Sequence, residues 1–144
     1  MKLQDLAAKV GETMGTSDWF LIDQARINAF ADNTEDHQFI HVNPEMAKMT
    51  PFGTTIAHGF LTLSLLPKFF DMAMTIRQSR MGVNYGLNRV RFTAPVPVGS
   101  RLRARMKLLA CEAIEHDGLQ MIWLVTLERE GSDKPVCIAE SIAR

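Results

Sequence analysis

The chain has 144 residues, of which 47% are hydrophobic and 22% charged, and its 16 basic side chains balance 16 acidic ones. This length fits one domain, residues 1–144, and the fractions are typical of a folded globular protein, which excludes disordered, collagen-like and coiled-coil classes. The net charge of zero argues against a general binder of nucleic acid or of an anionic membrane. No apolar run reaches the roughly 18 residues of a membrane span, no secretory signal is recognised and the two cysteines form no metal-binding motif, so we expect a cytoplasmic protein with reduced thiols.

The first predicted elements lie between residues 19 and 31. Trp19–Ile22 is a short apolar run with the length of a strand. Asp23 fits the N-cap of a helix through about Ala31, because a carboxylate can accept hydrogen bonds from the N–H groups of the first turn.

A polar segment and a short helix follow. The polar run Asn33–Gln38 leads into Phe39–Val42, which we expect to be extended. Pro44 suits the first position of a short helix over Glu45–Lys48, with Asn43 as its cap, because the N–H that proline lacks would have no helical acceptor there.

A strongly apolar helix is predicted to begin near Thr55. Its segment Ile56–Leu66 carries apolar side chains on nearly every face, which predicts that the helix is buried inside the fold. Pro67 should kink or end this helix, because its ring removes a backbone donor and clashes with the preceding turn.

The last third of the chain has the character of strands. Arg101–Leu108 alternates strictly between polar and apolar residues, and Met121–Leu127 is an apolar run of strand length. Asp117-Gly118 predicts the hairpin turn between them, and Gly131–Asp133 predicts a second turn before Val136–Ala139. An antiparallel sheet that wraps the apolar helix, in a single α+β domain, is the predicted architecture.

Ionisable residues gather just before the apolar helix. Asp36 and His41 are five positions apart, and a carboxylate and an imidazole in one pocket could hold a water molecule and exchange its proton. A capped loop with hydrogen-bonded histidines is the alternative. Gly59 lies near the start of the helix, where its N–H could donate to a carbonyl oxygen that becomes negative during a reaction, although close helix packing also explains a glycine.

Two further groups of residues have simpler interpretations. The histidines His37, His41 and His58 fit no structural zinc pattern, and we expect no metal. Basic side chains at alternate positions of Arg101–Lys107 could meet the phosphates of a nucleotide-bearing thioester, but a solvated sheet face is the simpler explanation.

Four segments resemble those of a known family. Asp36–Glu45, Pro51–Ser64, Asn84–Phe92 and Pro95–Ser100 are similar to segments of the MaoC-like dehydratases, the R-specific enoyl-CoA hydratases, including the branch of nodulation protein N. The resemblance implies a hotdog fold, with an antiparallel sheet around a long helix, and a homodimer.

The resemblance also implies roles for single residues. Asp36 and His41 match the family's hydratase dyad, and Gly59 matches its backbone donor to the thioester carbonyl. Asn43 stands where aspartate is frequent in the family, and Pro67 stands where some members have a serine.

Further candidates for binding substrate are few. Asn84, Tyr85 and Gly86 could line the substrate channel, although strand packing also accounts for them. His58 could support the site from behind or face solvent.

The resemblance implies that the reaction is the addition of water to a trans-2-enoyl thioester, which gives an R-3-hydroxyacyl thioester. Its partner is an acyl thioester of coenzyme A or of an acyl carrier protein, with no separate cofactor. A thioesterase on the same fold and a non-catalytic acyl-thioester binding protein are the alternatives, because a fold alone does not fix a reaction.

Overall fold

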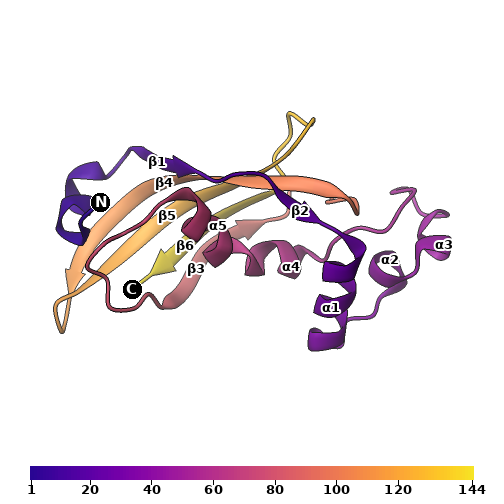
Figure 1. Ribbon diagram of the computed structural model, residues 1–144, viewed down its shortest axis with the longest axis horizontal. Coiled ribbons are helices and arrows are strands. Elements are labelled where there is room, and N and C mark those ends of the chain that lie inside the picture. Colours follow the sequence, from indigo (N-terminus) through magenta and orange to yellow (C-terminus); the bar gives the residue numbers. More distant parts are fainter.

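An antiparallel sheet of six strands forms one wall of the structure, a computed structural model that describes residues 1–144 (Figure 1). The strand order is β1-β4-β5-β6-β3, and β2 also pairs with β4, so β3 lies at an edge. The strands are β1 (Thr13–Thr16), β2 (Phe20–Ile22), β3 (Asn84–Arg91), β4 (Ser100–Ile114), β5 (Gly118–Arg129) and β6 (Cys137–Ala143).

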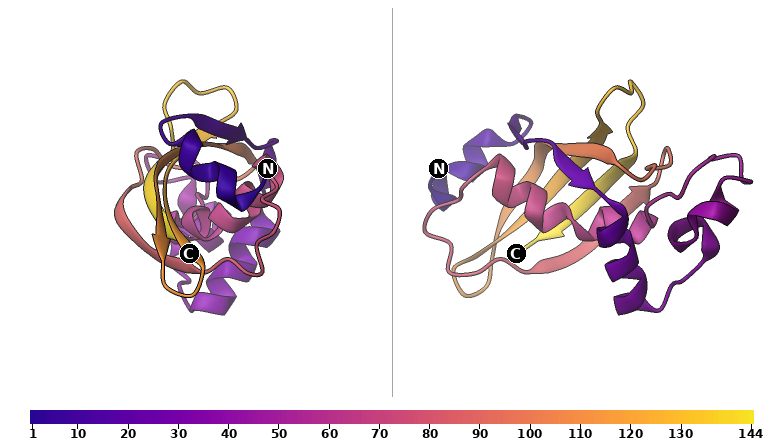
Figure 2. Two further views of the ribbon diagram at one scale, coloured as in Figure 1. Left: turned by 90° about the vertical axis from the view of Figure 1, so that its left-hand side faces the viewer. Right: turned by 45° about the vertical axis from the view of Figure 1, so that its right-hand side comes forward.

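Helices cover one face of this sheet and extend past one end of it. A 3-10 helix, η1, precedes β1, and five α-helices follow. They are η1 (Leu3–Lys9), α1 (Gln24–Thr34), α2 (Phe39–Val42), α3 (Pro44–Ala47), α4 (Gly59–Ser64) and α5 (Leu66–Ala73). In the end-on view of Figure 2 the sheet curves around α4 and α5, whereas α1, α2 and α3 lie beyond the end of the sheet in Figure 1.

The core lies between the sheet and the broken helix α4–α5. Side chains at alternate positions of β4, from Leu102 to Leu108, are fully buried, as the alternating sequence predicts. Phe69 of α5 is also fully buried, and the ring of Phe70 packs edge-on against Trp123 of β5 with the ring centroids 5.3 Å apart. The predicted α+β domain, a sheet wrapped around a long helix, is confirmed.

Local chemistry fixes the starts of α1 and α3 as predicted, whereas α1 continues to Thr34, past its predicted end near Ala31. The Asp23 carboxylate accepts a hydrogen bond from the N–H of Arg26 at 2.9 Å, and the Asn43 side chain accepts one from the N–H of Met46 at 3.1 Å. Pro67 lies in the first turn of α5, directly after the break between α4 and α5, so the predicted kink is confirmed.

The long helix starts later than predicted, at Gly59 rather than near Thr55. The preceding residues bond to a neighbouring extended segment instead: the N–H of Ala57 donates to the carbonyl of Val96 at 2.8 Å, and the N–H of Val98 donates to that of Thr55 at 2.9 Å. These hydrogen bonds hold residues 55–57 extended and delay the helix.

The composition of the helix predicted burial on nearly every side, but one side is exposed. Phe60 is 70% exposed, and it lies beside the half-exposed ring of Phe92, which follows β3. The side chains of Tyr85 and Leu87 on the edge strand β3 are exposed as well. One apolar face of the fold therefore remains uncovered within a single chain.

Two other local predictions need correction. Phe39–Val42 is one turn of helix rather than extended, because the N–H of Asn43 closes a turn on the carbonyl of Phe39 at 3.0 Å. The hairpin turn lies one residue earlier than predicted, since His116 and Asp117 adopt the positive φ angles of 59° and 57°. No element was predicted before residue 19, where the structure has η1 and β1.

None of the helices combines the length and apolar character that a transmembrane helix needs. The cytoplasmic location stays a prediction.

The fold predicts different costs for the same substitution at two methionines. Met106 in β4 is fully buried, so Met106→Ala should lower the free energy of unfolding by about 2–5 kcal/mol through lost burial and a new cavity. Met49 is 90% exposed, and Met49→Ala should change it by less than about 0.5 kcal/mol. Urea unfolding measures both values, and equal costs would contradict this placement of the core.

Candidate active site

Three segments meet where the sheet ends. Asp36 follows the end of α1, His41 lies on α2, and His58 is the N-cap residue of α4. One polar side-chain atom from each of these three residues lies within 4.8 Å of the others. The structure thus brings together Asp36 and His41, which the sequence singled out as a pair.

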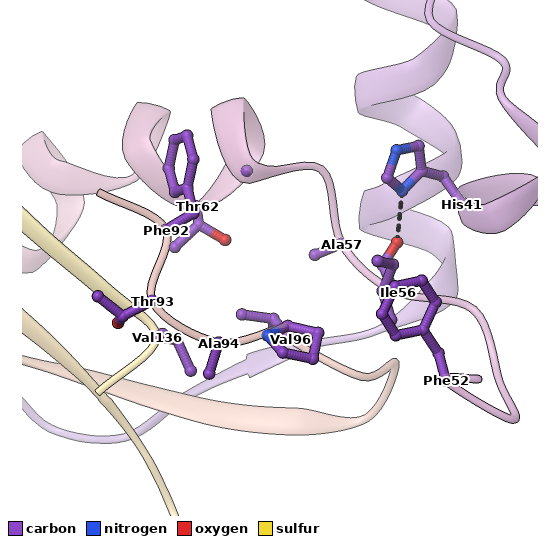
Figure 3. A pocket seen from close by; sticks show the side chains of 12 residues that line it. His41, Phe52, Ile56, Ala57, Thr62, Phe92, Thr93, Ala94, Val96 and Val136 are labelled. Carbon is purple, nitrogen blue, oxygen red and sulfur yellow. Dashed lines mark hydrogen bonds between the residues drawn. The ribbon is translucent and has the colours of Figure 1, made fainter. Parts of the chain in front are cut away.

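His41 is buried, and its hydrogen bonds fix its ring. Its Nδ1 lies 2.7 Å from the carbonyl oxygen of Ile56 (Figure 3). A carbonyl oxygen only accepts hydrogen bonds, so Nδ1 carries the proton and Nε2 keeps a lone pair. The main-chain carbonyl of His41 accepts from the Gln24 amide at 2.8 Å, and the Thr55 hydroxyl donates to the other end of that amide at 2.6 Å.

Burial lowers the pKa of His41 below its ordinary value of 6.5, and the neighbouring His58 lowers it further. The hydrogen bond to Ile56 and the negative charge of Asp36 oppose this shift, but they are outweighed. The imidazole is therefore neutral at neutral pH, with Nε2 able to accept a proton.

The Asp36 side chain is held more loosely. Glu35 leaves α1 in the left-handed conformation, with φ of 61°, and turns the chain toward α2. The Asp36 side chain is 50% exposed, and its Oδ1 accepts from the N–H of Gln38 at 3.4 Å. Its main-chain carbonyl accepts a hydrogen bond from Nε2 of His58 at 3.0 Å.

A cavity of about 370 Å³ adjoins His41 and the start of α4. Most of its lining is apolar, and His41 is the only ionisable side chain in it. The lining residues are His41, Phe52, Ile56, Ala57, Gly59, Thr62, Phe92, Thr93, Ala94, Pro95, Val96 and Val136 (Figure 3). The cavity can accept an apolar chain with a polar group at the His41 end.

The surroundings of Gly59 agree both with a backbone donor and with close packing as the reason for a glycine. As the first residue of α4 it has an N–H without an acceptor inside the helix, and it lines the cavity. A Cβ atom at this position would lie 2.9 Å from the ring of Phe92. Close packing therefore explains why a side chain is excluded, and the N–H remains available as a donor.

The remaining predicted substrate residues lie elsewhere. Asn84, Tyr85 and Gly86 line a second cavity of about 230 Å³ next to Pro67, and none of them lines the cavity beside His41. His58 is 3% exposed and lines neither cavity, so it contacts the site from behind.

The structure adds residues that sequence reasoning did not single out. The wall opposite His41 comes from Phe92–Val96 after β3 and from Val136 before β6. Gln24 and Thr55 support the turn that carries His41. Only the tertiary fold brings these segments together, and no spacing along the chain signals it.

The hydrogen bonds at the cluster bear on metal binding. Nδ1 of His41 and Nε2 of His58 are both engaged with main-chain carbonyls, and the two rings are stacked with centroids 3.8 Å apart. One side-chain atom each from Asp36, His41 and His58 nevertheless lies within 4.8 Å of the others, a spacing that a metal ion could bridge. The absence of a metal stays a prediction.

The basic stripe of β4 has acidic partners on β5 and directly after it. Arg103 and Arg105 each lie 2.8 Å from an oxygen of Glu128, and Arg101 lies 3.5 Å from Glu130. These ion pairs favour the solvated sheet face over a phosphate-binding surface.

Similar proteins are known for nearly the whole chain. The sequence profile described as the MaoC like domain matches residues 5–124. The 3-hydroxyacyl-thioester dehydratase Z of Mycobacterium tuberculosis (strain ATCC 25618 / H37Rv) is 54% identical over 97% of this chain and 93% of its own. Nodulation protein N of Rhizobium leguminosarum bv. viciae is 47% identical over 99% of this chain and 89% of its own. The solved (R)-hydratase from A. caviae shares the fold, with a TM-score of 0.72 at 22% identity over 92% of this chain and 96% of that one.

The lowered pKa of His41 predicts a pH-dependent contribution to stability. The unfolded chain binds a proton on this residue near pH 6.5 and the folded chain does so only at lower pH, so the free energy of unfolding should fall as pH drops below about 6.5. His41→Asn, which keeps a donor near the place of Nδ1, should weaken this dependence. Urea unfolding of the wild type and of His41→Asn measures this dependence from about pH 5 to about pH 7.5, a range of roughly one unit or more on either side of 6.5. Identical pH profiles of the two proteins would refute the lowered pKa of His41.

Proposed function

The chain belongs to the family of the MaoC like domain and has the hotdog fold, and from this premise we propose that it adds water to a trans-2-enoyl thioester. The full-length similarity to a 3-hydroxyacyl-thioester dehydratase supports the hydro-lyase class, because dehydration is the reverse of this hydration. The R configuration of the product rests on the family resemblance. The substrate itself carries coenzyme A or an acyl carrier protein, and no further cofactor takes part.

The observation that carries the proposal is the pairing of Asp36 with a neutral His41. Asp36 offers carboxylate oxygens, and Nε2 of His41 offers a lone pair, on groups within 4.8 Å of one another. A water molecule that donates one hydrogen bond to each acceptor would be held with its oxygen lone pair free to attack.

The reaction then follows from the parts of the site. The thioester carbonyl oxygen accepts a hydrogen bond from the N–H of Gly59, which draws electron density from the double bond and makes C3 electrophilic. The water oxygen bonds to C3 while Asp36 or His41 takes one of its protons, and the electron pair of the double bond moves onto the thioester as an enolate. Protonation of C2 completes the addition, so that OH and H enter from one water molecule.

Two alternatives are less well supported. A thioesterase with a serine or cysteine nucleophile lacks support, because the cavity lining contains neither residue. The similarity to nodulation protein N, whose name states no reaction, keeps a non-catalytic acyl-thioester binding protein as the second candidate.

A homodimer is part of the proposal. The edge strand β3 leaves backbone hydrogen-bonding groups unpaired, and apolar side chains beside it are exposed. They include Phe60, Tyr85, Leu87 and Phe92. A second copy that pairs along this edge would cover them.

Turnover of a crotonyl thioester tests the proposed reaction. The wild type should reversibly bleach the absorbance of the conjugated double bond without releasing a thiol, and Asp36→Asn and His41→Asn should each lower kcat by about 10²–10⁴-fold, because each removes an acid–base group. Asp32→Asn is the matched control, since Asp32 is 76% exposed and bonds only to His37, and it should keep wild-type kcat.

Other outcomes of this assay discriminate among the candidates. Release of free thiol would identify a thioesterase, and binding without any change in absorbance would identify a binding protein. Near-normal hydration by either dyad variant would reject the assigned residues while leaving the reaction standing.

A further inference from the structure

His58 is the most buried ionisable residue of the Asp36–His41 cluster, and it contacts both members of the dyad. It is 3% exposed, at the N-cap position of α4. Its ring stacks on that of His41 with centroids 3.8 Å apart and an angle of 23° between the planes. On another side, the ring of Phe30 from α1 lies 4.9 Å away, so the imidazole is enclosed by α1, α2 and the loop of Asp36.

The hydrogen bonds of His58 define its tautomer. Its Nε2 lies 3.0 Å from the main-chain oxygen of Asp36, and a carbonyl only accepts, so the proton is on Nε2. Its Nδ1 is buried and has no hydrogen-bond partner in the protein. The ring therefore offers the loop of Asp36 one fixed N–H donor.

Asp36 depends on this contact for its position. Its half-exposed side chain accepts only the long hydrogen bond from the N–H of Gln38, and its main-chain carbonyl accepts the hydrogen bond from Nε2 of His58. His41 is fixed independently, through Ile56 and Gln24. The hydrogen bond from His58 is therefore the one direct link between the loop of Asp36 and the start of α4.

We propose that His58 is a positioning residue, whose Nε2–H holds the main chain of Asp36 so that its carboxylate faces the same water as His41. The inference rests on the proposed hydratase function and goes beyond it, because the dyad then has a third member that touches no substrate. A rigid ring enclosed by Phe30 and His41 sets the direction of this hydrogen bond more strictly than a flexible donor would.

Two substitutions separate the donor from the ring. His58→Phe keeps an aromatic ring in the stack but removes the donor, whereas His58→Gln places an amide N–H the same number of bonds from Cα. His58→Phe should lower kcat by about 10–100-fold, the order expected when a reacting group is displaced by about 1 Å, with KM unchanged because His58 does not line the cavity. His58→Gln should recover most of this loss, and His37→Gln, on an exposed histidine of the same loop, is the control that keeps wild-type kcat.

A double-mutant comparison shows whether His58 acts through Asp36. In an Asp36→Asn background, His58→Phe should change the remaining kcat by less than about threefold, because the group that it positions no longer works. A general structural role would lower kcat by the same factor in both backgrounds and would overturn the inference. Wild-type kcat in His58→Phe would overturn it as well.

Nitrogen NMR of the histidine rings gives a readout that does not depend on activity. The wild type should show His58 protonated at Nε2 and bare at Nδ1, and His58→Gln should leave the His41 tautomer unchanged. If the wild type hydrates no enoyl thioester, the proposed function fails. The tautomer of His58 then still tests its hydrogen bond to Asp36. A neutral His58 ring with its proton on Nδ1 and none on Nε2 would refute the contact whatever the activity, and it would do so even if His58→Phe failed to fold.

Discussion

A single buried hydrogen bond, from Nδ1 of His41 to the carbonyl of Ile56, determines the chemistry of the whole site. It fixes the tautomer of the imidazole and the plane of its ring, and it directs the lone pair of Nε2 away from the main chain. Burial keeps the ring neutral, so this lone pair is available at neutral pH. In the proposed reaction, the carboxylate of Asp36 and the N–H of Gly59 work together with this fixed nitrogen of His41.

The fold holds the carbonyl of Ile56, and with it the ring of His41, in place from two directions. The segment that carries Ile56 is extended, and it is tied to α2 by the hydrogen bond from the N–H of Ile56 to the carbonyl of Ile40 at 3.0 Å. On its other side it is tied to the segment before β4 through Val96. The same extended segment then turns into α4 at Gly59, inside the curve of the sheet. This one segment thus carries the carbonyl that binds His41, the N–H of Gly59 and part of the cavity wall.

Sequence reasoning succeeded where chemistry is local and failed where packing decides. Asp23 and Pro67 were placed correctly because capping and the missing proline N–H act within one turn of helix. The periodicity and the family resemblance both predicted the fold, and the pair Asp36 and His41 that the resemblance singled out lies together in the structure, while its role as a dyad stays a prediction. The turn at Phe39–Val42 is held by Gln24 and Ile56, which bond to its carbonyls from distant parts of the chain. The cavity wall at Phe92 and the stacking of His58 behind His41 likewise join segments far apart in the chain. An apolar tetrapeptide or a lone histidine carries no information about such partners.

The most direct measurement of the central claim is a crystal structure of the protein with an unreactive acyl thioester bound. The account predicts one ordered water within hydrogen-bond distance of both the Asp36 carboxylate and Nε2 of His41, with the thioester carbonyl oxygen on the N–H of Gly59. A thioester seated in the cavity beside Asn84–Gly86, or a carbonyl far from Gly59 with no solvent shared by the two side chains, would contradict it.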